Sequence, residues 1–195
     1  MPARKKFFIF FFVFFFCFFF AATTFAQNLL RNPGFEDGID SWSKYGGVME
    51  EVKSPVHGGG KAIKFISTTT STKYVYQVVG VSPNKEYKMS GWLHRNDDNI
   101  DSLYLRASWY SSSDGSGSAI SSSDLDKLTN SNKEFSYQEI VVISPDNSHS
   151  AKVKLMLDPI SSATAVAYFD DLVYQEVTQT TPTPIAFPTQ VLTSY

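Results

Sequence analysis

The chain has 195 residues, with 17 basic and 19 acidic side chains, and 11 of its 17 phenylalanines lie within residues 7–20. Residues 1–26 hold three basic side chains and the only cysteine, Cys17, so the rest of the chain carries a net charge of −5. This composition excludes a disulfide scaffold, a cysteine nucleophile and a thiolate metal site beyond residue 26, and the mildly acidic charge argues against nucleic-acid binding.

Residues 1–26 have the organisation of a secretory signal peptide. Basic residues at 4–6 precede an apolar run at 7–22, and small residues follow, so we expect cleavage before Gln27. The alternative is an uncleaved membrane anchor, but the run of 16 residues is shorter than the roughly 20 that span a bilayer as a helix. In both cases we expect export: the chain is secreted and free of the membrane after cleavage, or it stays at the cell surface if the leader is kept. The lack of cysteine after the leader fits a secreted bacterial domain that is stabilised by its core.

Residues 27–177 have the length of one domain and the pattern of an all-β protein. Apolar and polar residues alternate with a period of two, and no stretch shows a sustained helical period. The alternating runs lie at 61–67, 87–94, 103–110 and 152–157. Turn residues separate them, at 82–84, 96–99, 114–117 and 144–147. We therefore predict a two-sheet antiparallel β-sandwich, or jelly roll, in which each strand has one face for the core and one for solvent or a ligand.

Residues 178–195 differ in composition from the predicted domain. They are rich in threonine and proline and show no alternation. Such a segment predicts an extended linker or tail without a core. Because a linker joins two domains, we expect the chain to come from a longer multidomain protein, whose further domain the sequence does not identify.

The motifs that would support catalysis are incomplete. Glycines at 58–60 precede Lys61 as in a phosphate loop, but the first, spaced glycine is missing and Ala62 replaces the residue that binds magnesium. The histidines lack the paired spacing of a zinc site; they are His57, His94 and His149. Neighbouring carboxylates in a strand point to opposite faces, so none of the adjacent pairs flanks one bond as glycoside hydrolysis requires; the pairs lie at 50–51, 97–98 and 170–171. We therefore predict that this chain is not itself an enzyme.

Two segments at the ends of the domain resemble a known family. The domain opens with NLLRNPGFE at 28–36, shortly before Asp-Ser-Trp at 40–42, and it closes with AYFDDLVY at 167–174. With Lys-Glu-Tyr at 85–87, these motifs resemble the CenC-type carbohydrate-binding modules of the galactose-binding-like superfamily, over essentially all of 27–177. The resemblance implies a β-jelly roll, frequently a structural calcium ion, and further domains joined by Thr/Pro-rich linkers. It does not specify a sugar ligand, because fold does not imply function.

The resemblance also implies a metal site between the two end motifs. Glu36 follows the Asn-Pro-Gly turn and Asp170 lies in the last predicted strand, and the matching positions of the family meet at one calcium site. Asp170 is preferred over Asp171 because it lies on a mostly apolar side of its strand, where an unpaired carboxylate is costly; the choice between them stays open. Calcium takes about six to eight oxygen ligands, which carbonyl groups near Gly60 and Lys61 would complete. In the alternative, both carboxylates bond only to backbone amides or to Lys61.

Aromatic rings beside polar groups are the candidates for sugar binding. Rings stack on the apolar faces of pyranoses, and flanking polar side chains bond to the hydroxyl groups. Trp92 lies on the polar side of one predicted strand, and Tyr104, Arg106 and Tyr110 lie on the polar side of the next, which we expect to be its neighbour. These four residues form the predicted sugar-binding face. In the alternative, Trp92 and Tyr104 pack under a loop or at a sheet edge.

The parity of other aromatic residues predicts core positions. Trp109 has the same parity as Leu105, and Tyr87 and Phe65 face inward by the same rule. Trp42 is expected to close one end of the sandwich, as its place in the family pattern suggests.

We predict a monomeric, secreted and non-catalytic module that attaches a larger extracellular protein to polysaccharide. A second hypothesis is a structural or adhesive surface domain without a sugar site, which burial of both Trp92 and Tyr104 would favour. A third is the binding module of a glycoside hydrolase whose catalytic domain is missing from this chain. The sequence does not identify the carbohydrate.

Overall fold

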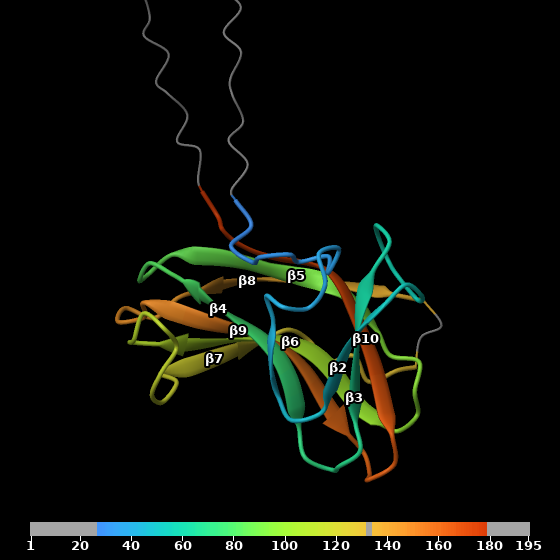
Figure 1. Ribbon diagram of the computed structural model, residues 1–195. Helices are drawn as coiled ribbons and strands as arrows, with labels where there is room; N and C mark the ends of the chain where they lie inside the picture. Colours follow the sequence, from blue (N-terminus) through green and yellow to red (C-terminus); the bar gives the residue numbers. More distant parts are fainter. Residues whose placement is uncertain (1–26, 132–133, 179–195) are drawn as a thin grey trace, which may run out of the picture.

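The computed structural model describes residues 27–131 and 134–178, so the predicted leader and nearly all of the predicted tail lie outside the described residues. The described residues form ten strands and no helix, in two antiparallel sheets of five strands each that face one another (Figure 1). This confirms the predicted all-β sandwich. The same residues include no helix that is long and apolar enough to cross a membrane.

The two sheets are called sheet A and sheet B. Sheet A has the strand order β1-β4-β9-β6-β7. Its strands are β1 (Ser43–Tyr45), β4 (Lys73–Gly80), β9 (Ser150–Pro159), β6 (Ile100–Tyr110) and β7 (Ser121–Asp124). Sheet B has the order β2-β3-β10-β5-β8. Its strands are β2 (Val48–Val52), β3 (Ala62–Ser67), β10 (Ala165–Glu176), β5 (Glu86–His94) and β8 (Ser136–Ile143).

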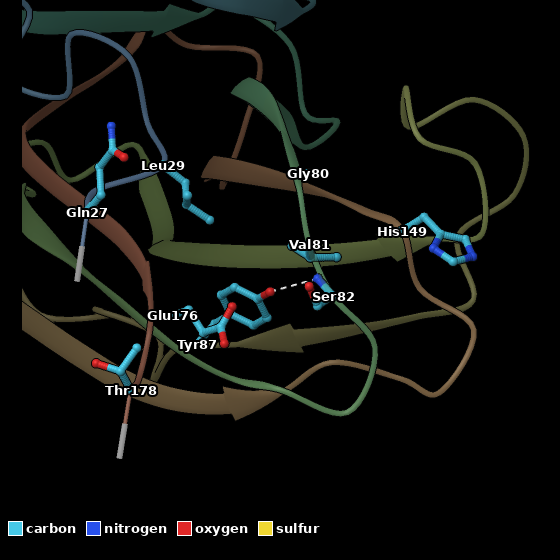
Figure 2. Close-up of a pocket in the computed structure, with 9 residues that line it drawn as sticks. All are labelled: Gln27, Leu29, Gly80, Val81, Ser82, Tyr87, His149, Glu176 and Thr178. Carbon is cyan, nitrogen blue, oxygen red and sulfur yellow. Dashed lines mark hydrogen bonds between the residues drawn. The ribbon is translucent and has the colours of Figure 1, made fainter. Parts of the chain in front are cut away.

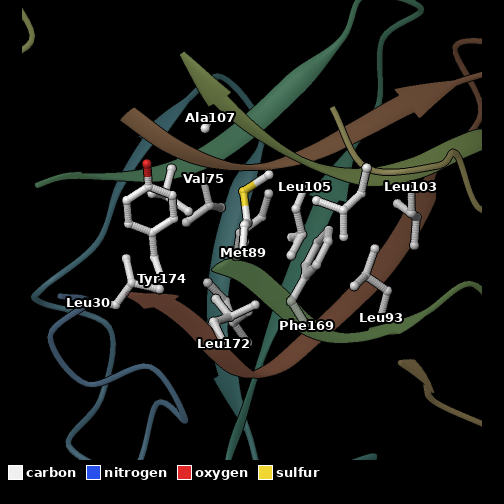
Figure 3. Close-up of a cluster of buried hydrophobic side chains, with 14 of the residues drawn as sticks. Leu30, Val75, Met89, Leu93, Leu103, Leu105, Ala107, Phe169, Leu172 and Tyr174 are labelled. Carbon is white, nitrogen blue, oxygen red and sulfur yellow. The ribbon is translucent and has the colours of Figure 1, made fainter. Parts of the chain in front are cut away.

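The core lies between the two sheets and is built from their inward-facing residues. Figure 3 shows Leu105 of sheet A and Phe169 of sheet B among the side chains that meet there, and both are buried. The rings of Tyr87 and Tyr174 stack in parallel at 5.3 Å, beside the fully buried Trp109. Burial of one such side chain stabilises the fold by about 1.5–3 kcal/mol. The predicted core positions of Trp109 and Tyr87 are confirmed, and Phe65 is also fully buried.

The opening and closing motifs of the domain lie side by side. The side chain of Asn28 donates a hydrogen bond to the carbonyl of Leu172 at 2.8 Å, and its oxygen accepts one from the N–H of Tyr174 at 3.0 Å. Trp42 is buried against Phe35, with ring centroids 5.2 Å apart. Two motifs separated by more than a hundred residues therefore hold one end of the sandwich together.

The connection from β5 to β6 crosses from one sheet to the other. β5 pairs with β10 and β8, whereas β6 pairs with β9 and β7, so the expectation that these two consecutive strands are neighbours is wrong. Arg95 lies buried in this crossing, where its guanidinium donates hydrogen bonds to the carbonyl of Ile100 and to the hydroxyl of Ser131. The turn residues at 96–99 predicted a connection between the two strands, but they did not show that it crosses to the other sheet.

Candidate functional site

The outer face of sheet A brings together aromatic and charged side chains from all five of its strands. In β6 the inward positions are apolar and buried, so alternation directs Tyr104, Arg106 and Tyr110 outward. The antiparallel register places Tyr45, Tyr74, Met156 and Tyr104 in one row across the sheet. The next row holds Tyr76, Lys154, Arg106 and Asp124. We call this surface the tyrosine–lysine face and define it by Tyr45, Tyr74, Tyr76, Tyr104, Arg106, Tyr110, Asp124, Lys152 and Lys154.

Basic side chains lie over the tyrosine rings of this face. The ammonium group of Lys154 is 4.8 Å from the ring centroid of Tyr74. That of Lys152 is 5.3 Å from the ring of Tyr76 and 4.9 Å from the ring of Tyr110. Each cation–ring contact contributes about 0.5–1 kcal/mol at an exposed site. The rings therefore favour positions of the cations above the outer face of the sheet.

Arg106 is paired, whereas its two basic neighbours on β9 are not. Its guanidinium forms two hydrogen bonds with the carboxylate of Asp124, at 2.6 and 2.7 Å, and this contact raises the pKa of Arg106. Lys152 and Lys154 form no ion pair with any residue of the described ranges. The pKa of Lys154 is lowered, first by burial and then by the positive charges of Arg106 and Lys152.

Tyr104 and Tyr110 lie on the predicted face but are buried. Tyr104 is only 3% exposed, because the ammonium of Lys127 lies 4.8 Å from its ring centroid and the guanidinium of Arg106 5.5 Å. Burial, followed by the negative charge of Asp158, raises the pKa of Tyr104 to about 12. The expectation that Tyr104 is an open aromatic platform is therefore wrong, and the ring packs beneath basic side chains instead.

The open aromatic ring of this face is Tyr45, at the end of the edge strand β1. Tyr45 is 59% exposed and stacks on Tyr74, with centroids 5.0 Å apart. The sequence also placed Lys152 and Lys154 on one polar side of a strand, and the structure confirms that both point outward. Nothing in the local pattern showed that this strand lies next to β6, so neither lysine was a candidate.

Trp92 lies on the outer face of sheet B, so the structure does not bring it together with Tyr104, Arg106 and Tyr110. The imidazole of His57 stacks on its ring with centroids 3.6 Å apart, and the ring of Tyr137 lies 5.2 Å away. We call His57, Trp92, Phe135 and Tyr137 the sheet B aromatic cluster. Trp92 is half-buried here, under the loop that carries His57.

Asp170 is fully buried and bonded to backbone amides. Its Oδ2 accepts hydrogen bonds from the N–H groups of His57 at 2.8 Å and Gly58 at 3.2 Å, and its Oδ1 accepts one from Asp171 at 2.8 Å. Burial raises the pKa of Asp170, while these amide hydrogen bonds act in the opposite direction. Asp171 instead bonds to the ring Nδ1 of His57 at 2.7 Å.

Glu36 reaches the same loop from the opening motif. Its Oε1 accepts hydrogen bonds from the N–H groups of Gly60 at 2.9 Å and Lys61 at 3.1 Å. The ammonium of Lys61 pairs with Glu51, so neither Glu36 nor Asp170 has a basic side-chain partner in the described ranges. A Cβ atom at Gly59 would lie 2.1 Å from Oε1 of Glu36, so a larger residue there would require the Glu36 side chain to move.

The carboxylate oxygens of Glu36 and Asp170 at this loop are of the type that calcium prefers, and no basic side chain of the described residues neutralises them. The hydrogen bonds are nevertheless those of the alternative arrangement, because Gly60 and Lys61 present N–H groups rather than carbonyls to Glu36. The described part of the chain contains no group of three His, Cys, Asp or Glu side chains placed to hold a metal. Glu36 and Asp170 would hold an ion only together with backbone carbonyl oxygens.

A pocket of about 450 Å³ lies at the end of the sandwich where the domain begins and ends (Figure 2). Leu29, Val81 and Tyr87 contribute its apolar surface, and Glu176 lies beside them. The N–H of Ser82 donates a hydrogen bond to the hydroxyl of Tyr87 at 2.8 Å, so this polar group is already engaged.

Comparison with known proteins identifies a family. Residues 27–157 match the family model described as a carbohydrate binding domain. Exochitinase 1 of Streptomyces olivaceoviridis is 34% identical over 109 residues, which are 56% of this chain and 17% of that protein. The match therefore spans only a small part of the length of this relative.

Solved structures with the same fold include several carbohydrate-binding modules. A family 16 carbohydrate-binding module shares 20% identity at a TM-score of 0.59, over 75% of this chain and 99% of that chain. TmCBM61 in complex with β-1,4-galactotriose shares 21% identity at a TM-score of 0.55, over 78% of this chain and 100% of that chain. The CBM22-1 and GH10 modules of xylanase 10B of Clostridium thermocellum, complexed with xylohexaose, share 16% identity at a TM-score of 0.63. This match covers 80% of this chain and 30% of that chain. Similarity at this level of identity shows the fold alone.

Proposed function

Because the chain belongs to the carbohydrate-binding domain family that residues 27–157 match, we propose that its tyrosine–lysine face is the surface that binds polysaccharide. One observation carries this proposal: the register of sheet A gathers tyrosines and basic side chains from separate strands on one outer face. On sheet B, by contrast, His57 covers the ring of Trp92.

The face supplies the two kinds of contact that sugar recognition needs. The exposed ring of Tyr45 offers an apolar platform, and Arg106 with the two lysines of β9 offers hydrogen-bond donors for hydroxyl groups. Tyr104 and Tyr110 act from beneath, by holding these cations in place. An open sheet face runs along several sugar units, so we propose an extended glycan, as in the structural neighbours complexed with xylohexaose and galactotriose.

The module is proposed to act without catalysis, as an attachment domain of a larger extracellular protein. The matched relative is an exochitinase in which the matching segment is a minor part, which supports a role beside a separate catalytic domain. Export by the leader at 1–26, cleavage before Gln27 and a linker at 178–195 complete this proposal. Mass spectrometry of the secreted protein tests the cleavage site, and a retained Met1 in the membrane fraction would contradict it.

We also propose a structural calcium ion at Glu36 and Asp170. The support is the burial of a carboxylate that no basic side chain of the described residues neutralises, together with the convergence of both acidic residues on one glycine-containing loop at 57–61. The ion would supply positive charge there and fix the loop, but it would have no part in sugar chemistry.

A structural or adhesive domain without a sugar site is the second candidate function, and the burial of Tyr104 favours it. A pull-down of the secreted protein with insoluble polysaccharides, followed by affinity electrophoresis with soluble ones, separates the two candidates. Binding to at least one polysaccharide that Arg106→Ala weakens supports the proposed face. Failure to bind any of them, with a cooperative unfolding transition that shows a folded protein, supports the structural domain.

A further inference from the structure

The charge of the tyrosine–lysine face is opposite to that of the whole chain. The protein has a formal net charge of −2, yet Asp124, the carboxylate of this face, pairs with Arg106. Asp158, which lies beside Tyr104, pairs with Lys127 at 3.2 Å. After these pairs are matched, the positive charges of Lys152 and Lys154 remain. An acidic protein therefore keeps two unneutralised cations on its candidate binding surface.

Lys154 lies where an unpaired ammonium is costly. It projects from β9, an interior strand of sheet A, and is half-buried between the ring of Tyr74 and the guanidinium of Arg106. Its lowered pKa reflects this burial and the nearby cations. A residue needed only to cover the tyrosine would be more stable without the charge. The cation–ring contact with Tyr74 offsets only part of this cost, so the charge gains most when an anion is present.

The cations also occupy the tyrosine rings that a neutral sugar would use. Lys154 lies over Tyr74, and Lys152 lies over Tyr76 and Tyr110. A neutral pyranose that stacks on the covered side of these rings has to displace an ammonium group, whereas an anionic sugar can pair with it where it stands. Among the tyrosines of the face, Tyr45 alone has no cation over its ring in the described part of the chain.

We propose that the polysaccharide bound by the tyrosine–lysine face is anionic, with carboxylate or sulfate groups that pair with Lys152 and Lys154. This inference rests on the proposed function, because it names the ligand class of the same face. Arg106 is tied to Asp124 and holds the neighbouring hydroxyl groups, while the two lysines select for charge.

Matched polymers test the charge requirement. Affinity electrophoresis of the secreted protein compares polygalacturonate with highly methyl-esterified pectin, which has the same backbone without most of its charge, and dextran sulfate with dextran. We expect polygalacturonate, dextran sulfate or both to retard the protein. Retardation by the first indicates a carboxylate ligand, and retardation by the second indicates a sulfate ligand. Retardation should weaken as salt rises, because the contacts are ionic.

Variants test the two lysines. Lys152→Met and Lys154→Met keep most of the apolar stem and are each expected to lower the affinity about tenfold or more, as for the loss of a hydrogen bond to a charged group. Lys154→Arg should retain binding. The matched control is Lys88→Met, which removes the same charge from sheet B, where Lys88 pairs with Glu139. Melting temperatures that do not fall exclude unfolding as the cause.

The possible failures are distinguishable. Equal affinity for charged and neutral polymers overturns the anionic ligand but leaves a polysaccharide-binding face in place. An equal loss of affinity in Lys88→Met and Lys154→Met overturns the pairing of the anion with the lysines of this face. Failure to bind any polymer, charged or neutral, overturns the proposed function as well.

Discussion

The outer faces of the two sheets carry similar residue types with opposite arrangements. On sheet A the tyrosine rings contact ammonium and guanidinium groups, and on sheet B the rings contact one another. His57 stacks on Trp92, and the ring of Phe135 meets His57 edge-on at 6.0 Å. The sheet A rings therefore position charges, whereas the sheet B rings hold a loop against the sheet.

This difference shows that an aromatic ring on a polar strand side is not by itself a sign of a ligand site. Trp92 and Tyr104 have the same pattern in the sequence, but they are covered differently. An imidazole from a distant loop covers Trp92, whereas Arg106 of the same strand and Lys127 of the connection after β7 cover Tyr104. The contacts of each ring decide its role. The sheet B aromatic cluster is expected to stabilise the protein, and the tyrosine–lysine face is expected to bind.

The largest expected effect is that of calcium on the loop at 57–61, which carries His57 of the sheet B aromatic cluster. If an ion joins Glu36 and Asp170, calcium stabilises the native state by RT ln(1 + [L]/Kd), which is about 2.7 kcal/mol at a hundredfold excess over Kd. Thermal unfolding of the secreted protein with EDTA and with added calcium measures this effect. We expect Glu36→Gln and Asp170→Asn to abolish the shift. A metal-stripped protein that melts at the same temperature with and without calcium would remove the site.

The next effect is on Trp92, which we expect to have a structural role. Trp92→Ala should lower the free energy of unfolding by about 2 kcal/mol, because it removes a half-buried ring and that ring's contacts with His57 and Tyr137. Polysaccharide affinity should not change. Urea unfolding and affinity electrophoresis measure the two quantities, with Trp92→Phe as the milder control. A folded Trp92→Ala protein that no longer binds polysaccharide would show that Trp92 is part of the binding site.

The exposed tyrosines of the two sheets form a matched pair. Tyr45→Ala on sheet A should weaken polysaccharide binding by about 1 kcal/mol, at the lower end of the loss measured for stacked bases, because one side of Tyr45 already meets Tyr74. Tyr137→Ala on sheet B, where the tyrosine is 46% exposed, should leave binding unchanged. Titration calorimetry with the polysaccharide that binds best gives both affinities. Equal losses of polysaccharide affinity in the two variants would show that the two faces do not differ in binding.

The smallest effect concerns the stability of Lys154→Met in the absence of ligand. The lowered pKa means that the folded state holds this proton less tightly than the unfolded chain, so the charge destabilises the fold at neutral pH. The penalty fades as the pH rises through the lowered pKa toward the ordinary lysine value. We therefore expect a gain of about 0.5 kcal/mol or less at pH 7, since the group is partly solvated, and none at high pH. Urea unfolding at both pH values measures it, and a loss of stability at pH 7 would show that Lys154 is needed for the fold.

The sequence predicted the fold class and much of the core, because alternation with a period of two is a local property. It placed Trp109 and Phe65 correctly, and the end motifs meet as the family resemblance implied. It could not show that the chain crosses between sheets after β5, since strand neighbours are set by long-range pairing.

The candidate site was predicted only in part for the same reason. Arg106 lies on the proposed face as expected, but the lysines that define its charge come from β9, which follows β6 after a long connection. The cover over Trp92 comes from His57, which the sequence treated as a scattered histidine. Contacts of this kind depend on tertiary structure and leave no local signal.

The measurement that tests the central claim most directly is a nuclear magnetic resonance titration of the labelled protein with the polysaccharide that binds best, or with its oligosaccharides. The account predicts that the largest shift changes lie on the outer face of sheet A, at Tyr45, Tyr76, Arg106 and Lys154, and that His57, Trp92 and Tyr137 stay unchanged. Shift changes confined to the sheet B aromatic cluster would contradict the account.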